Sequence, residues 1–567
     1  MRRLTRLEAS RLTWIALGVL LAATAALILY ETRRTTFWVD EWDWAMRRRG
    51  NDLGTFLRPH NEHLSLIPLA IYRFLFATAG LGDYLPYRIV ITVAHLGVAA
   101  LLFVYGRRRV GDFAALLVAT VFVLLGPAWQ NILWPFQVGS LISIAAGIGV
   151  LLCLDRGDRT GEIAACALLT VSLASSGIGL PIAVGVVVEV LWRRRLASVW
   201  IVAVPIALYA VWWIGYQRTD LVRHNIVLTP GYAADAFAGT LSALFGLAGP
   251  PTPGGGETLG WGRPLAIVAV AGIAWRLPRM VSVPPRVPAL LAMALSFWVA
   301  TALRRAAIST PYEGRYIYVS AFILLLLAFE LLRGVRVWPR VLVAATVVTG
   351  AIVVSNFGDL REGGRFLRDQ APPARAALGA LELARSYAKP DTIVTNFPGN
   401  PFVIIEAPLY FDAARDIGSP AMSADEIAAA PEPARQSADA NFTQLHDVAL
   451  APGGSVTPGG GAPRIDDSAG GTVATRGACV LLTPPDARTE ATPATLDVTL
   501  PPGGLLLRAQ GGEATVTLRR FAATFPTTPL ATLTAGGSGV LRIEGDDARQ
   551  PWHVRLAPQA RVRACAL

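Results

Sequence analysis

The densest group of chemically useful side chains in this sequence lies within residues 35–63, TTFWVDEWDWAMRRRGNDLGTFLRPHNEH. The carboxylates are Asp40, Glu41 and Asp43, and the aromatic residues that alternate with them are Trp38, Trp42 and Trp44. Carboxylates packed among large rings are partly desolvated, which suits one of them to accept a proton from a hydroxyl group. A belt of interfacial tryptophans with solvated charges is the plainer alternative.

A second polar group follows in the same segment, where His60, Glu62 and His63 stand close together. Two histidines and a carboxylate are metal-ligand types, but no third histidine stands nearby in the sequence, and the spacing favours no particular metal.

The segment 129–137, WQNILWPFQ, combines aromatic rings with side-chain amides. An indole such as Trp134 can stack on one face of a sugar ring while an amide such as Gln137 bonds its hydroxyls. An aromatic belt at the membrane surface is again the alternative, and it is favoured here.

The elements that must position these groups are membrane helices. Hydrophobic residues make up 53% of the 567 residues and charged residues only 16%, whereas soluble domains average about 25% charged. Mean hydropathy is +0.46. Apolar runs recur that are long enough to cross a ~30 Å hydrocarbon core, and we expect about eleven spans. The expected spans are 12–30, 87–105, 112–127, 138–154, 163–176, 178–192, 197–214, 264–278, 288–304, 316–333 and 340–356.

Arginine clusters orient these spans. The net charge is +11, and most of the positive loops fall on one side when eleven spans are counted. This side is predicted to be cytoplasmic, which places the first loop, 31–86, and everything after 356 outside. Segments 64–82 and 233–249 are apolar but break this parity if either one crosses, so both are predicted to lie in the outer interface.

The composition changes after residue 356. Residues 357–450 are predicted to form an extracytoplasmic region of mixed α/β structure, and 451–475 a Gly/Pro-rich linker. Short alternating runs over 476–567 predict a β-sandwich. Cys479 and Cys565 bracket this last part, where an extracytoplasmic disulfide is permitted. The predicted fold class is therefore a polytopic α-helical membrane protein with a soluble C-terminal region.

The pattern resembles the GT-C superfamily of membrane glycosyltransferases, which use polyprenyl-phosphate-linked sugars. The acidic motif VDEWDW at 39–44 directly follows the first helix, PHNEHLSLIPLAIYRFLF at 59–76 is similar to the family's interfacial helices, and GDYLPYRIVITVAHL at 82–96 opens the second span. The resemblance covers roughly residues 1–356, and implies a GT-C-like transmembrane domain with a catalytic first outer loop. The acidic set is D-E-W-D rather than a simple D-x-D.

The resemblance implies roles for individual residues. Asp40 is expected to be the general base, Glu41 its partner, and Asp43 the alternate base. Asp40 and Glu41 are also the candidate ligands of a divalent cation, Mg²⁺ or Mn²⁺. The donor phosphate is expected at Arg315, Arg88, Tyr316 and Arg305, because arginine binds phosphate in bidentate geometry. Contacts to sugar or acceptor are expected at Trp42, His60, Glu62, His63, Trp134 and Gln137.

The predicted function is transfer of a sugar to a cell-envelope glycan, lipid or protein on the outer face of the plasma membrane. Expected partners are membrane lipids, the lipid-linked donor and the acceptor. Nucleic acid is not expected, since the arginines stand at span ends rather than on one soluble face. A lipid-linked-sugar transporter and a non-catalytic glycan-binding scaffold remain as alternatives, and few charges within the spans argue against the transporter.

Overall fold

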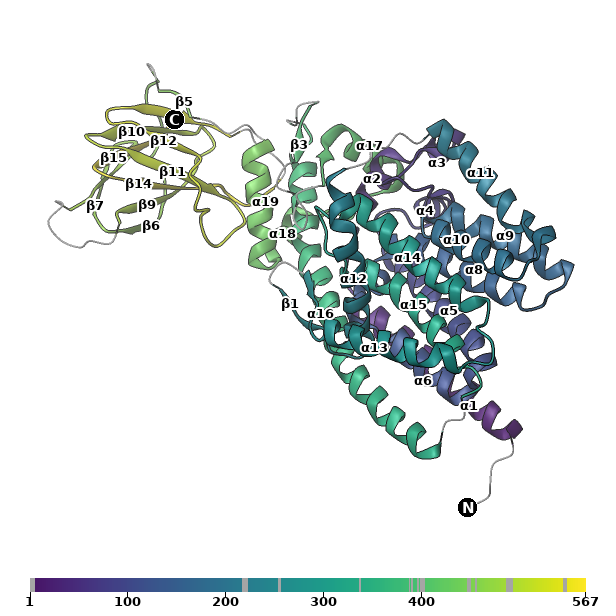
Figure 1. Cartoon of the computed structure of the whole chain (residues 1–567). Coiled ribbons are helices and arrows are strands. Elements are labelled where there is room, and N and C mark those ends of the chain that lie inside the picture. Colours follow the sequence, from purple (N-terminus) through teal and green to yellow (C-terminus); the bar gives the residue numbers. More distant parts are fainter. Residues whose placement is uncertain are drawn as a thin grey trace. The chain divides into compact units, whose positions relative to one another are not determined.

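The chain forms two compact units. Unit 1 comprises Met1–Arg34, Arg48–Ala79 and Tyr84–Leu367, and unit 2 comprises Thr35–Arg47, Gly80–Asp83 and Arg368–Leu567. The computed structural model (Figure 1) describes residues 6–216, 223–252, 256–335, 338–386, 388, 391–394, 397, 403–445, 450–453, 456–485, 493–543 and 548–567. The acidic segment 35–47 therefore belongs to unit 2 and not, as predicted, to the membrane domain.

Unit 1 is an α-helical bundle (Figure 1). Its first helices are α1 (Arg6–Glu31), α3 (Leu53–Leu57), α4 (Leu66–Thr78), α5 (Leu85–Val110), α6 (Asp112–Val123), α7 (Trp129–Leu133), α8 (Val138–Leu154), α9 (Arg159–Ser175) and α10 (Gly179–Trp192). The others are α11 (Trp200–Tyr216), α12 (His224–Leu244), α13 (Gly262–Arg276), α14 (Arg286–Arg305), α15 (Gly314–Leu331) and the first part of α16 (Pro339–Leu383). The hairpin of β1 (Gly249–Thr252) and β2 (Gly256–Thr258) precedes α13. Short 3-10 turns cover Gly126–Ala128, Pro135–Gln137, Leu196–Ser198 and Leu277–Arg279.

Seven helices in the described part of the chain are long and apolar enough to cross a membrane, which confirms a polytopic membrane protein. They are Ser10–Glu31, Leu85–Val110, Pro135–Leu154, Leu196–Tyr216, Arg286–Arg305, Gly314–Leu331 and Pro339–Leu383. The bent pair Asp112–Val123 and Gly126–Leu133 would be an eighth span, against about eleven predicted. Every predicted range overlaps a helix, but α9, α10 and α13 have only 17, 14 and 15 residues.

The predicted span 112–127 is broken. Helix α6 ends at Val123, and the chain turns by 52° before it continues through Gly126–Leu133. At the break, Gly126 lies against the backbone of α16, where an added Cβ would come within 1.8 Å of the Asn356 carbonyl oxygen. Only glycine permits this approach, so the break is a packing requirement of the bundle.

Helix α12 includes most of the predicted interfacial segment 233–249. Near its start, the Asn225 amide donates to the Leu303 carbonyl at the end of α14 (3.0 Å). Just before its end, the Ala243 carbonyl accepts from the Asn356 amide (3.2 Å). Under the predicted topology, the end of α14 and Asn356 both lie on the outer side. These contacts therefore agree with a helix that lies along one face of the bundle.

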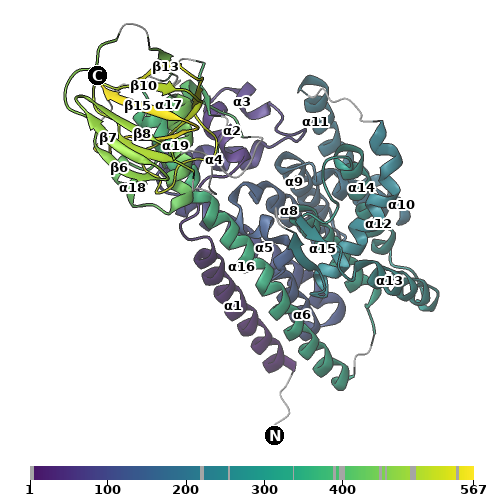
Figure 2. The ribbon, with the colours of Figure 1, turned by 90° about the vertical axis from the view of Figure 1, so that its left-hand side faces the viewer.

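Unit 2 contains α2 (Asp40–Arg47), the end of α16, a small helical region and a β-sandwich (Figure 2). The helices are α17 (Ala407–Ile417), α18 (Ala424–Ala429) and α19 (Glu432–Leu445), with a two-stranded sheet of β3 (Ile393–Val394) and β4 (Ile405–Glu406). The sandwich strands are β5 (Ala451–Pro452), β6 (Ile465–Ala469), β7 (Thr472–Arg476), β8 (Cys479–Thr483), β9 (Thr495–Thr499), β10 (Leu505–Gln510), β11 (Ala514–Arg519), β12 (Ala531–Leu533), β13 (Ser538–Leu541), β14 (His553–Pro558) and β15 (Arg561–Ala566).

The sandwich has two antiparallel sheets, in the orders β5-β13-β10-β15-β8-β7 and β12-β11-β14-β9-β6. Its core comes from the inward residues of strands such as β14, whose side chains alternate between buried and half-buried. Cys479 on β8 pairs with Cys565 on β15, and the two form a disulfide with an S–S distance of 2.15 Å.

The prediction that 451–475 is a linker needs correction, because this range contains β5, β6 and most of β7. Four of the five side chains in each of β6 and β7 are exposed. These strands are held by backbone pairing with β9 and β8 rather than by buried side chains. Their sequences, IDDSA and TVATR, lack an apolar alternation, so the pattern that identifies the other strands is missing here.

Candidate functional site

Helix α2 begins at a strained backbone position. Val39, which directly precedes Asp40, has a φ of 49°. A β-branched residue in this region is an outlier that costs about 1–3 kcal/mol, and such strain concentrates at functional sites. The turn is closed by hydrogen bonds from the Glu41 amide to the Trp38 carbonyl (3.3 Å) and from the Trp42 amide to the Val39 carbonyl (3.1 Å). The strain presents Asp40 at the start of the helix.

The structure separates the three carboxylates by environment. Glu41 is fully buried and accepts a hydrogen bond from the Trp38 backbone amide (2.9 Å), so it stabilises the start of α2. Asp43 forms an ion pair with Arg47 at 3.1 Å, one helical turn away. Asp40 and Asp43 are both half-buried, so burial sets only Glu41 apart. The choice between Asp40 and Asp43 as the base stays a prediction, with Asp40 preferred.

The tryptophans beside these carboxylates form a packed core. Trp42 and Trp44 are each 1% exposed. The Trp42 indole donates to the Phe37 carbonyl (3.1 Å), and its ring lies against Phe37 and Phe397. A buried indole has no open face for a sugar, so the burial of Trp42 counts against its predicted role as a sugar platform. Its packing instead holds α2 in place.

The acidic loop does not fit a metal ion. Glu41, one of the two predicted ligands, is buried and bonded to backbone. Within the described ranges, no group of three or more His, Cys, Asp or Glu side chains is placed to hold a metal. We therefore assign no catalytic step to a divalent cation.

In unit 1, His60 to His63 form a tight turn with strained central residues. The backbone amide of each histidine donates to the carbonyl of the other, at 3.1 and 3.0 Å. Asn61 and Glu62 between them have φ values of 45° and 71°. The buried Arg48 guanidinium donates to the carbonyls of Arg58 and Pro59, which fixes the chain entering the turn. His60 itself packs edge-on against Phe136.

The turn faces positive charge. Glu62 lies 3.7 Å from Arg305, and both side chains are about 30% exposed. The His63 side chain is exposed, yet desolvation by the surrounding protein and the positive charges of Arg305, His60 and Arg304 lower its pKa to about 4. His63 is therefore neutral near pH 7. It lies so close to Gly177 that a Cβ there would come within 2.4 Å of its Nδ1 atom.

Arg315 stands at the start of α15 among polar groups. Its guanidinium pairs with Glu313 (2.8 Å) and lies over the Tyr316 ring (5.1 Å), while its backbone amide donates to the Gln130 side chain (3.3 Å). Glu313 also accepts from Ser309 (2.5 Å). Burial, together with the charges of Tyr316 and Glu313, raises the pKa of the nearby Tyr232 phenol. The Arg315 side chain is 37% exposed, so it remains accessible.

We call Glu62, His63, Arg305, Glu313 and Arg315 the loop cluster. The five-residue turn from Arg305 to Ser309 connects its two parts, because the Ser309 amide donates to the Arg305 carbonyl and the Ser309 hydroxyl to Glu313. The roles of Glu313, Gln130 and Tyr232 were not predicted. Glu313 beside Arg315 was a visible signal, whereas no local pattern marks Tyr232.

The other predicted residues of unit 1 have structural partners. Arg88 bonds Thr32 through its Nε atom (2.9 Å) and also donates to the Leu29 carbonyl, so it ties α5 to α1. Trp134 is 3% exposed and stacks on Phe136. Gln137 is 9% exposed and accepts from Ser140 at 3.1 Å. Their burial favours packing over ligand contact.

No protein-family model matches the chain, and no curated protein matches it. Among solved structures, it is similar to ArnT from Cupriavidus metallidurans bound to undecaprenyl phosphate, with 15% identity, a TM-score of 0.42, and coverage of 72% of this chain and 85% of that one. It is also similar to the arabinofuranosyltransferase AftD from Mycobacteria, with 13% identity, a TM-score of 0.32, and coverage of 100% of this chain and 61% of that one. Likeness at this level assigns no role to any residue.

Proposed function

We propose that this chain is an integral membrane glycosyltransferase that moves a sugar from a polyprenyl-phosphate donor to a hydroxyl group of an envelope glycan, glycolipid or protein on the outer face. The observation that carries the proposal is the half-buried Asp40, which directly follows the strained Val39 and precedes the buried Glu41 and Trp42. Backbone strain next to a carboxylate is typical of catalytic sites.

In the proposed reaction, Asp40 accepts the proton of the acceptor hydroxyl as its oxygen attacks the anomeric carbon of the sugar. The bond from that carbon to the phosphate oxygen breaks, and polyprenyl phosphate leaves with the electron pair. In unit 1, Arg315 and Arg305 are the proposed donors to the phosphate of the lipid-linked sugar, because arginine forms two parallel hydrogen bonds to such a group. His63 and Glu62 of the same unit are the proposed contacts of the sugar or the acceptor.

We further propose that the β-sandwich holds a glycan acceptor. The sheet β12-β11-β14-β9-β6 carries a row of half-buried polar groups, in which His553 contacts Asp466 (2.7 Å) and Asp466 accepts from Thr499 (2.8 Å). Beside this row, Arg555 pairs with Asp497 (2.7 Å). Prearranged polar groups of this kind suit hydrogen bonds to sugar hydroxyls.

The transporter alternative has an observation against it. Transport would require the arginine-rich end of the bundle to open. Buried ion pairs, among them Arg286 with Glu189 at 2.8 Å and Arg109 with Glu330 at 2.6 Å, join the helices at that end.

The function is tested with the purified full-length protein in lipid vesicles. We expect it to release polyprenyl phosphate from polyprenyl-phosphate-linked pentoses or hexoses when envelope glycolipid is supplied, and not to use nucleotide sugars. If no lipid-linked sugar is turned over while a glycan binds with unchanged affinity, the chain is a glycan-binding scaffold instead.

The two predicted donor arginines provide a matched comparison. We expect Arg315→Gln to weaken donor binding by roughly tenfold or more, since a hydrogen bond to a charged group contributes ~1.5–3 kcal/mol. Arg88→Gln should lower thermal stability and leave donor affinity within about twofold, because Arg88 bonds α1. Binding of labelled polyprenyl phosphate and the unfolding temperature are measured for both variants. If only Arg88→Gln loses donor affinity, Arg88 rather than Arg315 binds the donor phosphate, and the prediction is wrong.

A further inference from the structure

A pocket lined by both charged and apolar side chains lies at the end of the bundle where α8 and α10 end and α9 and α11 begin. Its lining includes Asp158, Glu162, Glu189, Arg193, Arg195 and Ser198, and its empty volume is about 350 Å³, partly open to solvent. Helix α10 runs from this pocket to the region of Gly177 and His63. Since α10 has 14 residues at about 1.5 Å each, the pocket is roughly 20 Å from the loop cluster.

The carboxylates of the pocket already form hydrogen bonds and ion pairs within the protein. Glu162 accepts from Ser198 (2.6 Å) and from Arg159 (3.0 Å). Asp158 caps α9 by accepting from the Gly161 amide (2.7 Å), and it also pairs with Arg156 at 3.0 Å. The remaining carboxylate, Glu189, is shared between Arg193 at 2.7 Å and the buried Arg286 at 2.8 Å.

The arginines of the pocket have N–H groups that are still available to donate hydrogen bonds. In the described part of the chain, Arg195 has no side-chain partner, and the buried Nε atom of Arg193 has none either. The chain turns sharply here, since Arg194 has a φ of 53°. The hydrogen bonds that the pocket can still offer therefore come mainly from cationic donors, and such a pocket selects an anion.

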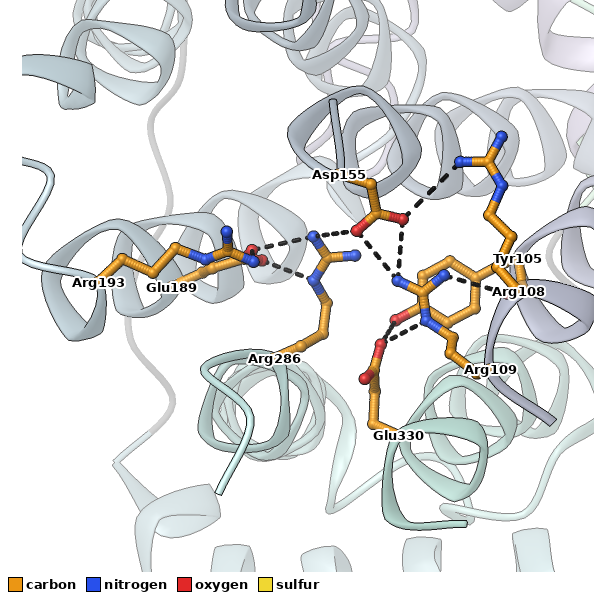
Figure 3. A network of polar contacts seen from close by, with 8 residues as sticks. All are labelled: Tyr105, Arg108, Arg109, Asp155, Glu189, Arg193, Arg286 and Glu330. Carbon is orange, nitrogen blue, oxygen red and sulfur yellow. Dashed lines mark hydrogen bonds and ion pairs between the residues drawn. The ribbon is translucent and has the colours of Figure 1, made fainter. Parts of the chain in front are cut away.

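The numbers of arginines and carboxylates around the pocket also favour an anion as ligand. The pocket adjoins a buried charge network (Figure 3), which consists of Tyr105, Arg108, Arg109, Asp155, Glu189, Arg193, Arg286 and Glu330. Network and pocket together, with the ion-pair partners Arg156 and Arg159, hold seven arginines against five carboxylates. Within this set, two positive charges are uncompensated.

The surroundings indicate a lipid rather than a soluble anion. Trp192, Leu196 and Val199, next to the arginines, are exposed apolar side chains. Arg159 lies over the Trp200 ring at 4.3 Å. Apolar and tryptophan side chains beside arginines at helix ends are typical of the membrane surface, and basic pockets between such helices hold anionic headgroups.

We propose that this pocket binds the phosphate headgroup of an anionic phospholipid, with Arg195 and Arg193 as donors. The bound lipid neutralises the excess positive charge at the end of α10 and seals the groove between α9, α10 and α11. This site is separate from the one proposed for sugar transfer, and its occupancy does not depend on catalysis.

The test uses the full-length protein in nanodiscs of phosphatidylcholine, with or without phosphatidylglycerol, and counts retained lipids by native mass spectrometry. We expect wild type to retain phosphatidylglycerol selectively and Arg195→Gln to reduce that retention roughly tenfold or more, because Arg195 is a direct hydrogen-bond donor to the phosphate in the proposed site. Arg194→Gln is the matched control: it removes the same charge from the neighbouring exposed residue, which does not line the pocket, and should change retention by about fivefold at most, the effect of one arginine near an anionic surface. Because Arg195 has no partner within the described ranges, its substitution should leave the fold intact.

Equal losses in the two variants would mean a diffuse charge effect and would overturn the proposal. No preference for phosphatidylglycerol in wild type would also overturn it. If inorganic phosphate displaces the lipid and is itself retained by wild type but not by Arg195→Gln, the ligand is a free anion and the lipid assignment is wrong.

Discussion

Asp40→Asn is expected to lower the rate of sugar transfer by ~10²–10⁴-fold, because an amide cannot accept the proton of the acceptor hydroxyl. Asparagine is nearly isosteric and suits the start of a helix as well as aspartate does, so α2 should keep its place. The measurement is release of polyprenyl phosphate at saturating donor, together with donor affinity. The loss should appear in kcat, with donor binding within about twofold.

Asp43→Asn is the matched control for this prediction. It makes the same chemical change three residues later and breaks the exposed ion pair with Arg47. Exposed pairs contribute little, so we expect less than about a tenfold change in rate. If Asp43→Asn abolishes transfer while Asp40→Asn does not, Asp43 is the base. If neither variant loses activity, the acidic loop is not catalytic.

Arg286→Met is expected to destabilise unit 1 by about 3–5 kcal/mol, the typical result of leaving a buried charge without its partner. Arg286 is 2% exposed and bonds Glu189, which is 1% exposed, as well as Asp155 at 3.2 Å. The free energy of unfolding in detergent, or the unfolding temperature, measures the effect. A large loss of stability is expected because the network connects α5, α10, α14 and α15 with the end of α8 (Figure 3).

Two further variants show whether the network itself is responsible. Arg156→Gln removes an arginine from the same end of the bundle, but its pair with Asp158 is exposed, so little change is expected. Adding Glu189→Gln to Arg286→Met should recover part of the lost stability, since the buried carboxylate that has lost one of its two arginine partners is then neutral. Equal stability of Arg286→Met and Arg156→Gln would contradict the prediction.

Long apolar runs and alternating short runs were sufficient to predict the membrane helices and most of the sandwich. Both patterns are local, because a helix or strand needs an apolar face of regular period to be buried. The prediction fails where the local pattern is weak. Strands β6 (IDDSA) and β7 (TVATR) are mostly exposed and lack an apolar alternation.

The sequence by itself determined that this is a polytopic membrane protein with a β-rich C-terminal region, and it singled out the acidic segment around Asp40. Only the tertiary structure decided that Glu41 is buried, that Arg88 ties helices together, and that Trp134 is buried. It also joined Tyr105 and Glu330, which are 225 positions apart, in one network. The physical reason is that hydropathy is a property of neighbouring residues, whereas the task of a polar side chain depends on partners that only folding brings within hydrogen-bonding distance.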